Sequence, residues 1–393
     1  MSGRVLIHVQ HLLGVGHLMR AARLASAAAA AGLETTLVSG GPPVPHLDPG
    51  RARLVQLPPM RADDESFASL VDGDGRPIDD AWRARRRDRL LELFAASRPD
   101  VLVTELFPFG RRQCRFELLP LLDAARRMRP RPAVACSVRD ILQAGRKPGR
   151  TQESAALVRD RYDTVLVHGD PRLIRFEETF PLAAEIEDRL AYTGYVAPPA
   201  PPAGGAGSGE VVVSAGGGAV GAALLRAAAA ARPLSALAQR TWRLLVGGDL
   251  GLAAELRRDP GLVVEPARPD FTRLLATAAV SVSQAGYNTA MDVLAARARA
   301  VFVPFVGAGE SEQSLRAARL ADRLGGIEIV AEARLTAARL AAAIDRAAAG
   351  PRPDPARMGA HGLDLSGAET TARMLDAVAA ERRRPAVNAA GAP

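Results

Sequence analysis

The sequence predicts an α/β fold with two doubly wound parallel-sheet domains that face a central cleft. Three observations predict it. Short apolar runs alternate with longer Ala, Leu and Arg segments of helical period, this pattern starts again near residue 210, and a Pro/Gly-rich stretch separates the two halves. Continuous apolar runs, rather than alternating ones, are typical of strands covered on both faces. With 393 residues and 48% hydrophobic composition, the chain is long enough for two such domains.

Each half supplies five expected strands. In the first domain, residues 1–197, they lie at 5–9, 36–38, 101–105, 133–138 and 164–167. Residues 198–209 are mostly Pro, Ala and Gly and are expected to form a linker. In the second domain, residues 210–382, strands are expected at 211–214, 242–246, 262–265, 280–283 and 301–304, and residues 383–393 are expected to be a disordered tail.

Composition excludes several classes of protein. Cys114 and Cys136 are the only cysteines, too few for a disulfide framework, so we expect a reducing, cytoplasmic location. No run of eighteen uncharged apolar residues occurs, and the N-terminal apolar run is broken by polar residues, so we expect neither a signal peptide nor a membrane span.

Positive charge is concentrated in one segment. The net charge is +8, and residues 81–131 contain 13 arginines against 6 acidic residues. This segment forms either a solvated helix face or a surface for an anionic membrane or a phosphorylated acceptor. Nucleic acid is not an expected partner, because aromatic residues make up 4% of the chain and none alternates with these arginines.

The first motif follows the first strand. Gly14 and Gly16 let the backbone approach a ligand, and His17 stands where a helix begins. A helix start disfavours the imidazolium form, so a neutral His17 could take a proton from a hydroxyl group. The alternative is that His17 only fills the first helical turn. His8 and His11 are expected to be structural.

The second motif opens the first helix of the second domain. Ser214 is followed by Gly216, Gly217 and Gly218, a turn that presents backbone N–H groups and a helix start to phosphate. A dinucleotide site is not expected, because the next strand ends at Gly248 and Asp249, later than a ribose-binding acid would lie. No P-loop motif is present.

The third motif is the most specific. Polar residues occur at two successive strand–helix junctions, and we expect Asn288 or Thr289 to cap the first of these helices. This geometry offers N–H groups to a diphosphate and a carboxylate to a ribose. The candidate donor-binding residues here are Gln284, Gly286, Tyr287, Asn288, Thr289, Asp292, Glu312 and Gln313.

These segments resemble GT-B glycosyltransferases, which have two Rossmann-like domains. The match is closest to those whose C-terminal domain is like that of the bacterial lipid-linked N-acetylglucosaminyl transferase of cell-wall synthesis, the glycosyltransferase family 28 C-terminal type. The matching motifs cover about residues 12–31, 211–221 and 280–325. Asp292 stands where that family more commonly has glutamate, and Glu312–Gln313 replaces a pair of glutamines or an Asp–Gln pair.

By position, the resemblance implies donor contacts in the second domain. Ser214 and the three glycines would meet donor phosphate, and Gly286 and Thr289 would line the diphosphate. Asp292 would bind ribose, while Glu312 and Gln313 would contact the donor sugar. Gly248, Gln284, Tyr287 and Asn288 complete the candidate donor site.

The acceptor side is expected in the first domain, with His17 lying against the acceptor. The candidate acceptor contacts are Gly14, Gly16, Glu105, Arg139 and Asp140. For the last three, the alternative is that they form loop caps and a local Arg–Asp pair.

The implied function is inverting, metal-independent transfer of a hexose or N-acetylhexosamine from a nucleotide sugar, expected to be a UDP-sugar, to a hydroxyl-bearing or lipid-linked acceptor. No cofactor is expected, and the enzyme could be peripheral on the inner face of the membrane. Residues 14–20 also resemble the UDP-sugar hydrolase of pseudaminic acid synthesis, in which His17 would activate water. A noncatalytic nucleotide-sugar sensor or an epimerase-like protein are further alternatives.

Overall fold

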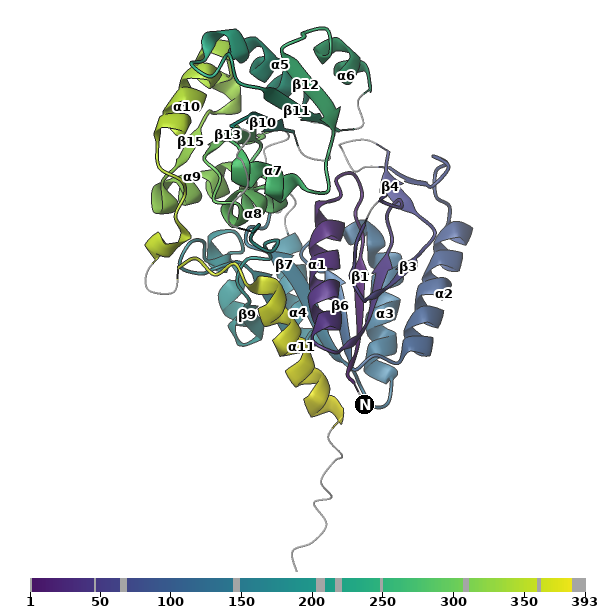
Figure 1. Cartoon of the computed structure of the whole chain (residues 1–393). Coiled ribbons are helices and arrows are strands. Elements are labelled where there is room, and N and C mark those ends of the chain that lie inside the picture. The colour runs from purple at the N-terminus through teal and green to yellow at the C-terminus, as the bar shows by residue number, and fades with distance from the viewer. Residues whose placement is uncertain are drawn as a thin grey trace, which may run out of the picture.

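The chain forms two α/β domains, each built on a parallel sheet flanked by helices (Figure 1). The computed structural model describes residues 2–45, 47–63, 69–143, 149–202, 209–215, 221–247, 250–306, 311–358 and 362–383. Half of the expected linker and nearly all of the expected tail lie outside these ranges. Among the described residues, no helix combines the length and apolar character that a membrane span requires.

The N-terminal sheet has the order β3-β2-β1-β6-β7-β8-β9, and its neighbouring strands all pair in parallel. Its strands are β1 Arg4–Val9, β2 Glu34–Ser39, β3 Arg53–Gln56, β6 Val101–Glu105, β7 Ala133–Arg139, β8 Thr164–His168 and β9 Leu190–Tyr192. The five expected strands are confirmed within about two residues at each end. The two edge strands, β3 and β9, were not expected from the sequence, because one is largely exposed and the other has three residues.

Helices and a small hairpin complete this domain. The helices are α1 Gly16–Ala30, α2 Asp80–Ser97, α3 Arg115–Arg127 and α4 Arg150–Arg161, and the antiparallel strands are β4 Met60–Ala62 and β5 Leu70–Asp72. The α2 helix begins where Asp79 accepts a hydrogen bond from the Trp82 backbone, which satisfies a free N–H of the first turn. Cys114 and Cys136 are free cysteines, and both are buried in the apolar core of this domain.

The C-terminal sheet has the order β12-β11-β10-β13-β14-β15 and is also parallel. Its strands are β10 Val211–Ser214, β11 Trp242–Val246, β12 Leu262–Pro266, β13 Val280–Ser283, β14 Ala300–Phe302 and β15 Ile327–Ile329. Its helices are α5 Ala222–Ala231, α6 Leu250–Leu256, α7 Phe271–Thr277, α8 Tyr287–Ala295, α9 Glu312–Leu324 and α10 Ala337–Ala349. Across both domains, short 3₁₀ helices lie at Arg112–Cys114, Phe176–Glu178, Ala183–Arg189, Arg232–Leu234, Glu332–Arg334 and Pro355–Met358.

The last helix returns to the first domain. α11 Gly367–Arg383 packs on α1 and contacts β1, β6 and β7 (Figure 1, yellow). Sequence reasoning placed this segment in the second domain. The helix packs on the first because its small apolar face, including Ala372 and Ala379, fits closely against the alanine-rich α1.

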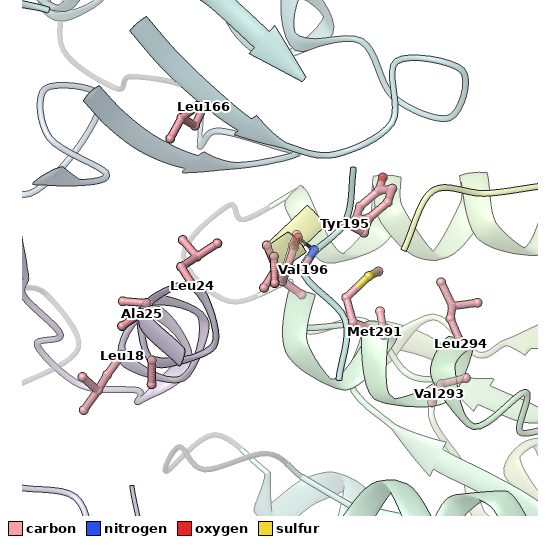
Figure 2. Packing of buried hydrophobic residues seen from close by; sticks show 14 of the residues in the cluster. Leu18, Leu24, Ala25, Leu166, Tyr195, Val196, Met291, Val293 and Leu294 are labelled. Carbon is pink, nitrogen blue, oxygen red and sulfur yellow. Dashed lines mark hydrogen bonds between the residues drawn. The ribbon is translucent and has the colours of Figure 1, made fainter. Parts of the chain in front are cut away.

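A single apolar cluster spans both domains. It joins Leu18 and Leu24 of α1 to Met291 and Leu294 of α8, and Tyr195 contributes from the segment after β9 (Figure 2). Two further clusters fill the other side of each sheet. The carboxyl-end loops of β1, β7, β13 and β14 all lead to residues that contact across the domain interface, so any site at these strand ends draws on both domains.

Candidate active site

His17 is the second residue of α1, next to the carboxyl end of β1. Its Nδ1 lies 2.8 Å from Glu105 Oε1, and its side chain is 14% exposed. Glu105 is the last residue of β6, which pairs with β1, so the parallel sheet brings these two positions to the same edge. Sequence reasoning proposed both residues but did not predict that they contact each other.

Glu105 is buried, and both carboxylate oxygens accept hydrogen bonds. Arg20 and His17 donate to Oε1, and the Ser137 hydroxyl donates to Oε2 at 2.6 Å. Burial alone would raise the pKa of Glu105, but the Arg20 charge and the hydrogen bonds from His17 and Ser137 lower it to about 2. Glu105 therefore stays a carboxylate and accepts hydrogen bonds from Arg20, His17 and Ser137.

His17 is neutral in this setting. Burial, with a contribution from the Arg111 charge, lowers the pKa of His17 to about 3, even though Glu105 favours the imidazolium. Because the ionised Glu105 requires a donor, the neutral ring carries its proton on Nδ1, which leaves the Nε2 lone pair as the basic position. The geometry can thus accept a proton at Nε2 and stabilise the resulting imidazolium through Glu105.

The second domain brings the start of α8 to the start of α1. Asn288 Nδ2 donates to the carbonyl oxygen of Gly16 at 2.9 Å. The expected capping of this helix by Asn288 or Thr289 is wrong: Gly286 is the N-cap, α8 begins at Tyr287, and no side chain caps it. Asn288 is used for the domain contact instead, while Gly286 and Thr289 are half-buried at the helix start.

Asp292 lies one turn further along α8 and also faces the first domain. Its Oδ1 lies 3.0 Å from Arg23 Nη2 and 3.4 Å from the Thr272 hydroxyl, and its side chain is 13% exposed. Burial raises the pKa of Asp292, although the Arg23 charge opposes that shift. The carboxylate expected to bind ribose is thus held by an arginine from the other domain.

A second set of ion pairs crosses the interface. Arg316 of α9 binds Asp140 through Nε at 2.9 Å and Nη2 at 2.6 Å, and the same Nη2 lies 2.9 Å from Glu312. Arg139 in turn pairs with Glu312. Arg139 and Asp140 therefore each pair with the other domain, rather than forming the local pair considered as an alternative.

Sequence reasoning did not identify Arg316. The only local signal is its position four residues after Glu312, on the same helix face. Its partner Asp140 lies 176 positions away in the chain, and local patterns carry no information about such a pairing.

Tyr287 lies between Arg20, which binds Glu105, and Arg316, which binds Asp140. The Cζ atoms of Arg20 and Arg316 lie 5.1 and 5.5 Å from the centre of its ring. Its hydroxyl donates to the His168 carbonyl oxygen at 3.0 Å and accepts from the Val196 N–H at 2.9 Å. This candidate donor-binding residue is 5% exposed and connects the domains.

Comparison with known proteins identifies the second domain. Residues 215–367 match the model of the glycosyltransferase family 28 C-terminal domain. The chain is a glycosyltransferase. No curated protein matches it in sequence.

Solved structures show the same fold over nearly the whole chain. The calicheamicin glycosyltransferase CalG4 has a TM-score of 0.61 at 18% identity and covers 98% of this chain and 100% of its own. A UDP-glucosyltransferase from Polygonum tinctorium has a TM-score of 0.59 at 16% identity, with coverages of 98% and 99%. Acinetobacter baumannii MurG has a TM-score of 0.55 at 15% identity, with coverages of 95% and 99%. The fold is GT-B, as the sequence predicted.

The remaining predicted residues of this glycosyltransferase lie around the same strand ends. Ser214 is the last residue of β10 and is 9% exposed, Gln284 follows β13, and Gln313 Oε1 accepts from the Phe305 N–H at 3.1 Å. Gly14 is exposed in the loop before α1. The predicted donor-site residues Gly216, Gly217, Gly218 and Gly248 lie outside the described residues. His8 and His11 are 1% and 2% exposed.

No cluster of three or more His, Cys, Asp or Glu side chains suited to a metal ion occurs in the described part of the glycosyltransferase.

Proposed function

We propose that this nucleotide-sugar glycosyltransferase inverts the anomeric carbon and that His17 is its general base. The observation that supports the proposal is the His17–Glu105 contact at the edge of the first sheet. A carboxylate that fixes the Nδ1–H tautomer and stabilises the imidazolium is the arrangement by which an imidazole removes a hydroxyl proton.

In the proposed reaction the acceptor oxygen attacks the anomeric carbon of the donor. His17 Nε2 takes the hydroxyl proton as the new C–O bond forms, and the bond from the anomeric carbon to the diphosphate oxygen breaks with its electron pair. Nucleotide diphosphate leaves as an anion. A single displacement of this kind inverts the configuration at the anomeric carbon.

The donor is proposed to lie against the start of α8. The N-termini of α1 and α8 approach each other at Gly16 and Asn288, and two helix N-termini favour an anion between them. This arrangement supports our proposal that the leaving diphosphate is stabilised without a bound metal or cofactor. Related folds were solved with thymidine diphosphate, namely VinC and the spinosyn rhamnosyltransferase SpnG. Asp292 is the proposed ribose contact, and Glu312 and Gln313 are the proposed sugar contacts.

The acceptor is proposed to be a hydroxyl-bearing molecule on the His17 side, with a lipid-linked sugar as one class to test. The acceptor assignments of Gly14 and Gly16 fit that side. The acceptor contacts of Glu105, Arg139 and Asp140 stay predictions, because Glu105 contacts His17 and the other two side chains pair with the second domain.

Nucleotide-diphosphate release tests the proposal directly. The purified protein is given UDP-glucose, UDP-N-acetylglucosamine or dTDP-glucose, with and without hydroxyl acceptors that include a polyprenyl-diphosphate-linked sugar. We expect release that depends on an acceptor, and a product whose anomeric configuration is opposite to that of the donor. Equal release without any acceptor would instead establish a hydrolase, and a product of retained configuration would overturn the single displacement.

A further inference from the structure

The hydrogen bonds around Glu105 continue deeper into the first domain. Ser137 lies directly beside Glu105 on the neighbouring strand β7, and its Oγ lies 2.9 Å from His168 Nε2 at the end of β8. His168 Nδ1 lies 2.8 Å from the Thr193 hydroxyl. Glu105, Ser137, His168 and Thr193 are each at most 2% exposed. A chain of polar side chains therefore crosses three adjacent strands behind His17.

The charge on Glu105 sets the direction of the hydrogen bonds from Ser137 to Glu105 and from His168 to Ser137. Because a carboxylate only accepts, Ser137 must donate its hydroxyl hydrogen to Glu105 Oε2. The Ser137 oxygen is then available to accept, so a neutral His168 donates from Nε2 and keeps Nδ1 as an acceptor beside the Thr193 hydroxyl, which also lies 3.0 Å from the Gly194 carbonyl oxygen. His17 and His168 are thereby assigned opposite neutral tautomers, Nδ1–H and Nε2–H.

We propose that Ser137 and His168 are positioning residues of the transfer reaction, holding the Glu105 carboxylate so that it orients His17. The inference rests on the proposed role of His17 as the base. Ser137 binds one oxygen of Glu105 while Arg20 and His17 share the other, so the carboxylate is held from both sides and cannot rotate away from the imidazole.

Packing alone does not account for this arrangement. Burying a hydroxyl and an imidazole costs free energy that apolar residues of similar volume would avoid, and most of the buried side chains on these strands are apolar. The chain also extends to the donor domain, because the Tyr287 hydroxyl donates to the His168 backbone oxygen at 3.0 Å. His168, which supports Glu105 through Ser137, thus contacts the helix proposed to bind the donor.

The tautomers can be measured without any substrate. Protein labelled with ¹⁵N-histidine has six histidines, and spectra of His17→Ala and His168→Ala assign the two signals by difference. We expect the wild type to show Nδ1–H at His17 and Nε2–H at His168. Ser137→Ala should shift His17 towards a mixture of tautomers. Ser154→Ala is the matched control, since Ser154 is a buried serine of the same domain whose hydroxyl, within the described part of the chain, donates to the backbone oxygens of Pro108 and Arg150.

Kinetic measurements use the donor that the release assay identifies. Ser137→Ala and His168→Leu should lower kcat about 10- to 100-fold, the range for a misplaced catalytic group, with KM for the nucleotide sugar unchanged. His168→Gln keeps an N–H near the Nε2 position and Ser137→Thr keeps the hydroxyl, so each should recover part of the loss. These conservative variants also serve if the larger changes prevent folding.

The two proposals fail in different ways. A wild type with His17 protonated on Nε2, or a Ser137→Ala protein that matches Ser154→Ala in both tautomer and kcat, would overturn the positioning role. Lack of nucleotide-diphosphate release with every donor would overturn the proposed function, while the tautomer measurement would still decide whether Ser137 orients His17.

Discussion

Asn288 of the second domain donates a hydrogen bond to the carbonyl oxygen of Gly16, the residue immediately before His17. This contact sets the start of α8 against the start of α1. The proposed base and the proposed diphosphate site are therefore neighbours only when the two domains are together. Arg20 and Tyr287 reinforce the same arrangement, because the guanidinium that binds Glu105 also stacks on a ring of the other domain.

His17→Ala tests the base. We expect turnover to fall about 10²- to 10⁴-fold, the usual contribution of general-base catalysis, while nucleotide binding measured by calorimetry is retained. His11→Asn is the control, since His11 is also buried after β1 but has no contact with Glu105 among the described residues. Full turnover by His17→Ala would show that His17 is not the general base and only packs in the first helical turn.

The sequence is sufficient to predict most strands of the two sheets but not the side-chain contacts between distant segments. The runs 101–103 and 211–213 are continuously apolar and buried, so the strand character of β6 and β10 is visible locally. The strand character of the edge strand β3 is not visible locally, because its side chains are mostly exposed. His17 could be proposed from its strand–glycine–helix context. The contact of His17 with Glu105, and that of Asp140 with Arg316, depend on tertiary packing between distant segments.

Arg316→Met tests the buried ion pairs at the interface. The change leaves Asp140 and Glu312 without their shared cation, and a buried pair broken on one side costs about 3–5 kcal/mol of unfolding free energy. We expect a clear drop in Tm. Arg319→Met is the matched control three residues along α9, because the Arg319–Glu178 pair crosses the same interface at the surface and is worth about 0–1 kcal/mol. Equal losses from the two variants would contradict the buried-pair interpretation.

Asp292→Ala tests the proposed ribose contact. Loss of charge-assisted hydrogen bonds to ribose hydroxyls should weaken UDP binding by about 1–3 kcal/mol. Because the change also frees Arg23, Arg23→Ala is measured beside it to separate the loss of the domain contact from the loss of the carboxylate. Calorimetry that finds the same UDP affinity in Asp292→Ala and wild type would exclude Asp292 from the donor site.

The arginine segment 81–131 is expected to behave as a solvated surface rather than as a membrane-binding one. Arg83, Arg87 and Arg89 pair with nearby acidic residues, and Arg86 is buried against Glu117. We therefore expect no more binding to vesicles of anionic phosphatidylserine than to neutral phosphatidylcholine vesicles in a sedimentation assay. Binding that requires anionic lipid and weakens as salt rises would favour a membrane face instead.

Acid should destabilise the protein well above the pH at which carboxylates titrate. Burial lowers the pKa of His17 and His168 to about 3 and that of His8 and His11 to about 4, from an ordinary value of 6.5. As the pH falls below 6.5, these histidines are protonated in the unfolded chain before they are protonated in the folded protein. The free energy of unfolding is therefore highest above pH 6.5 and decreases as the pH falls towards 3. Each histidine contributes a slope of about 1.4 kcal/mol per pH unit within its own window.

Urea unfolding at intervals from pH 7 to pH 4.5 measures this slope. The groups facing His168 are Ser137, Thr193, Arg20 and Glu105, and Glu105, with its pKa lowered to about 2, stays ionised throughout the range. His168→Gln removes one titrating group but keeps a donor to Ser137, so its free energy of unfolding should fall less steeply with acid than that of the wild type. Identical slopes for the two proteins would show that folding does not lower the pKa of His168, which would contradict its burial as a neutral ring.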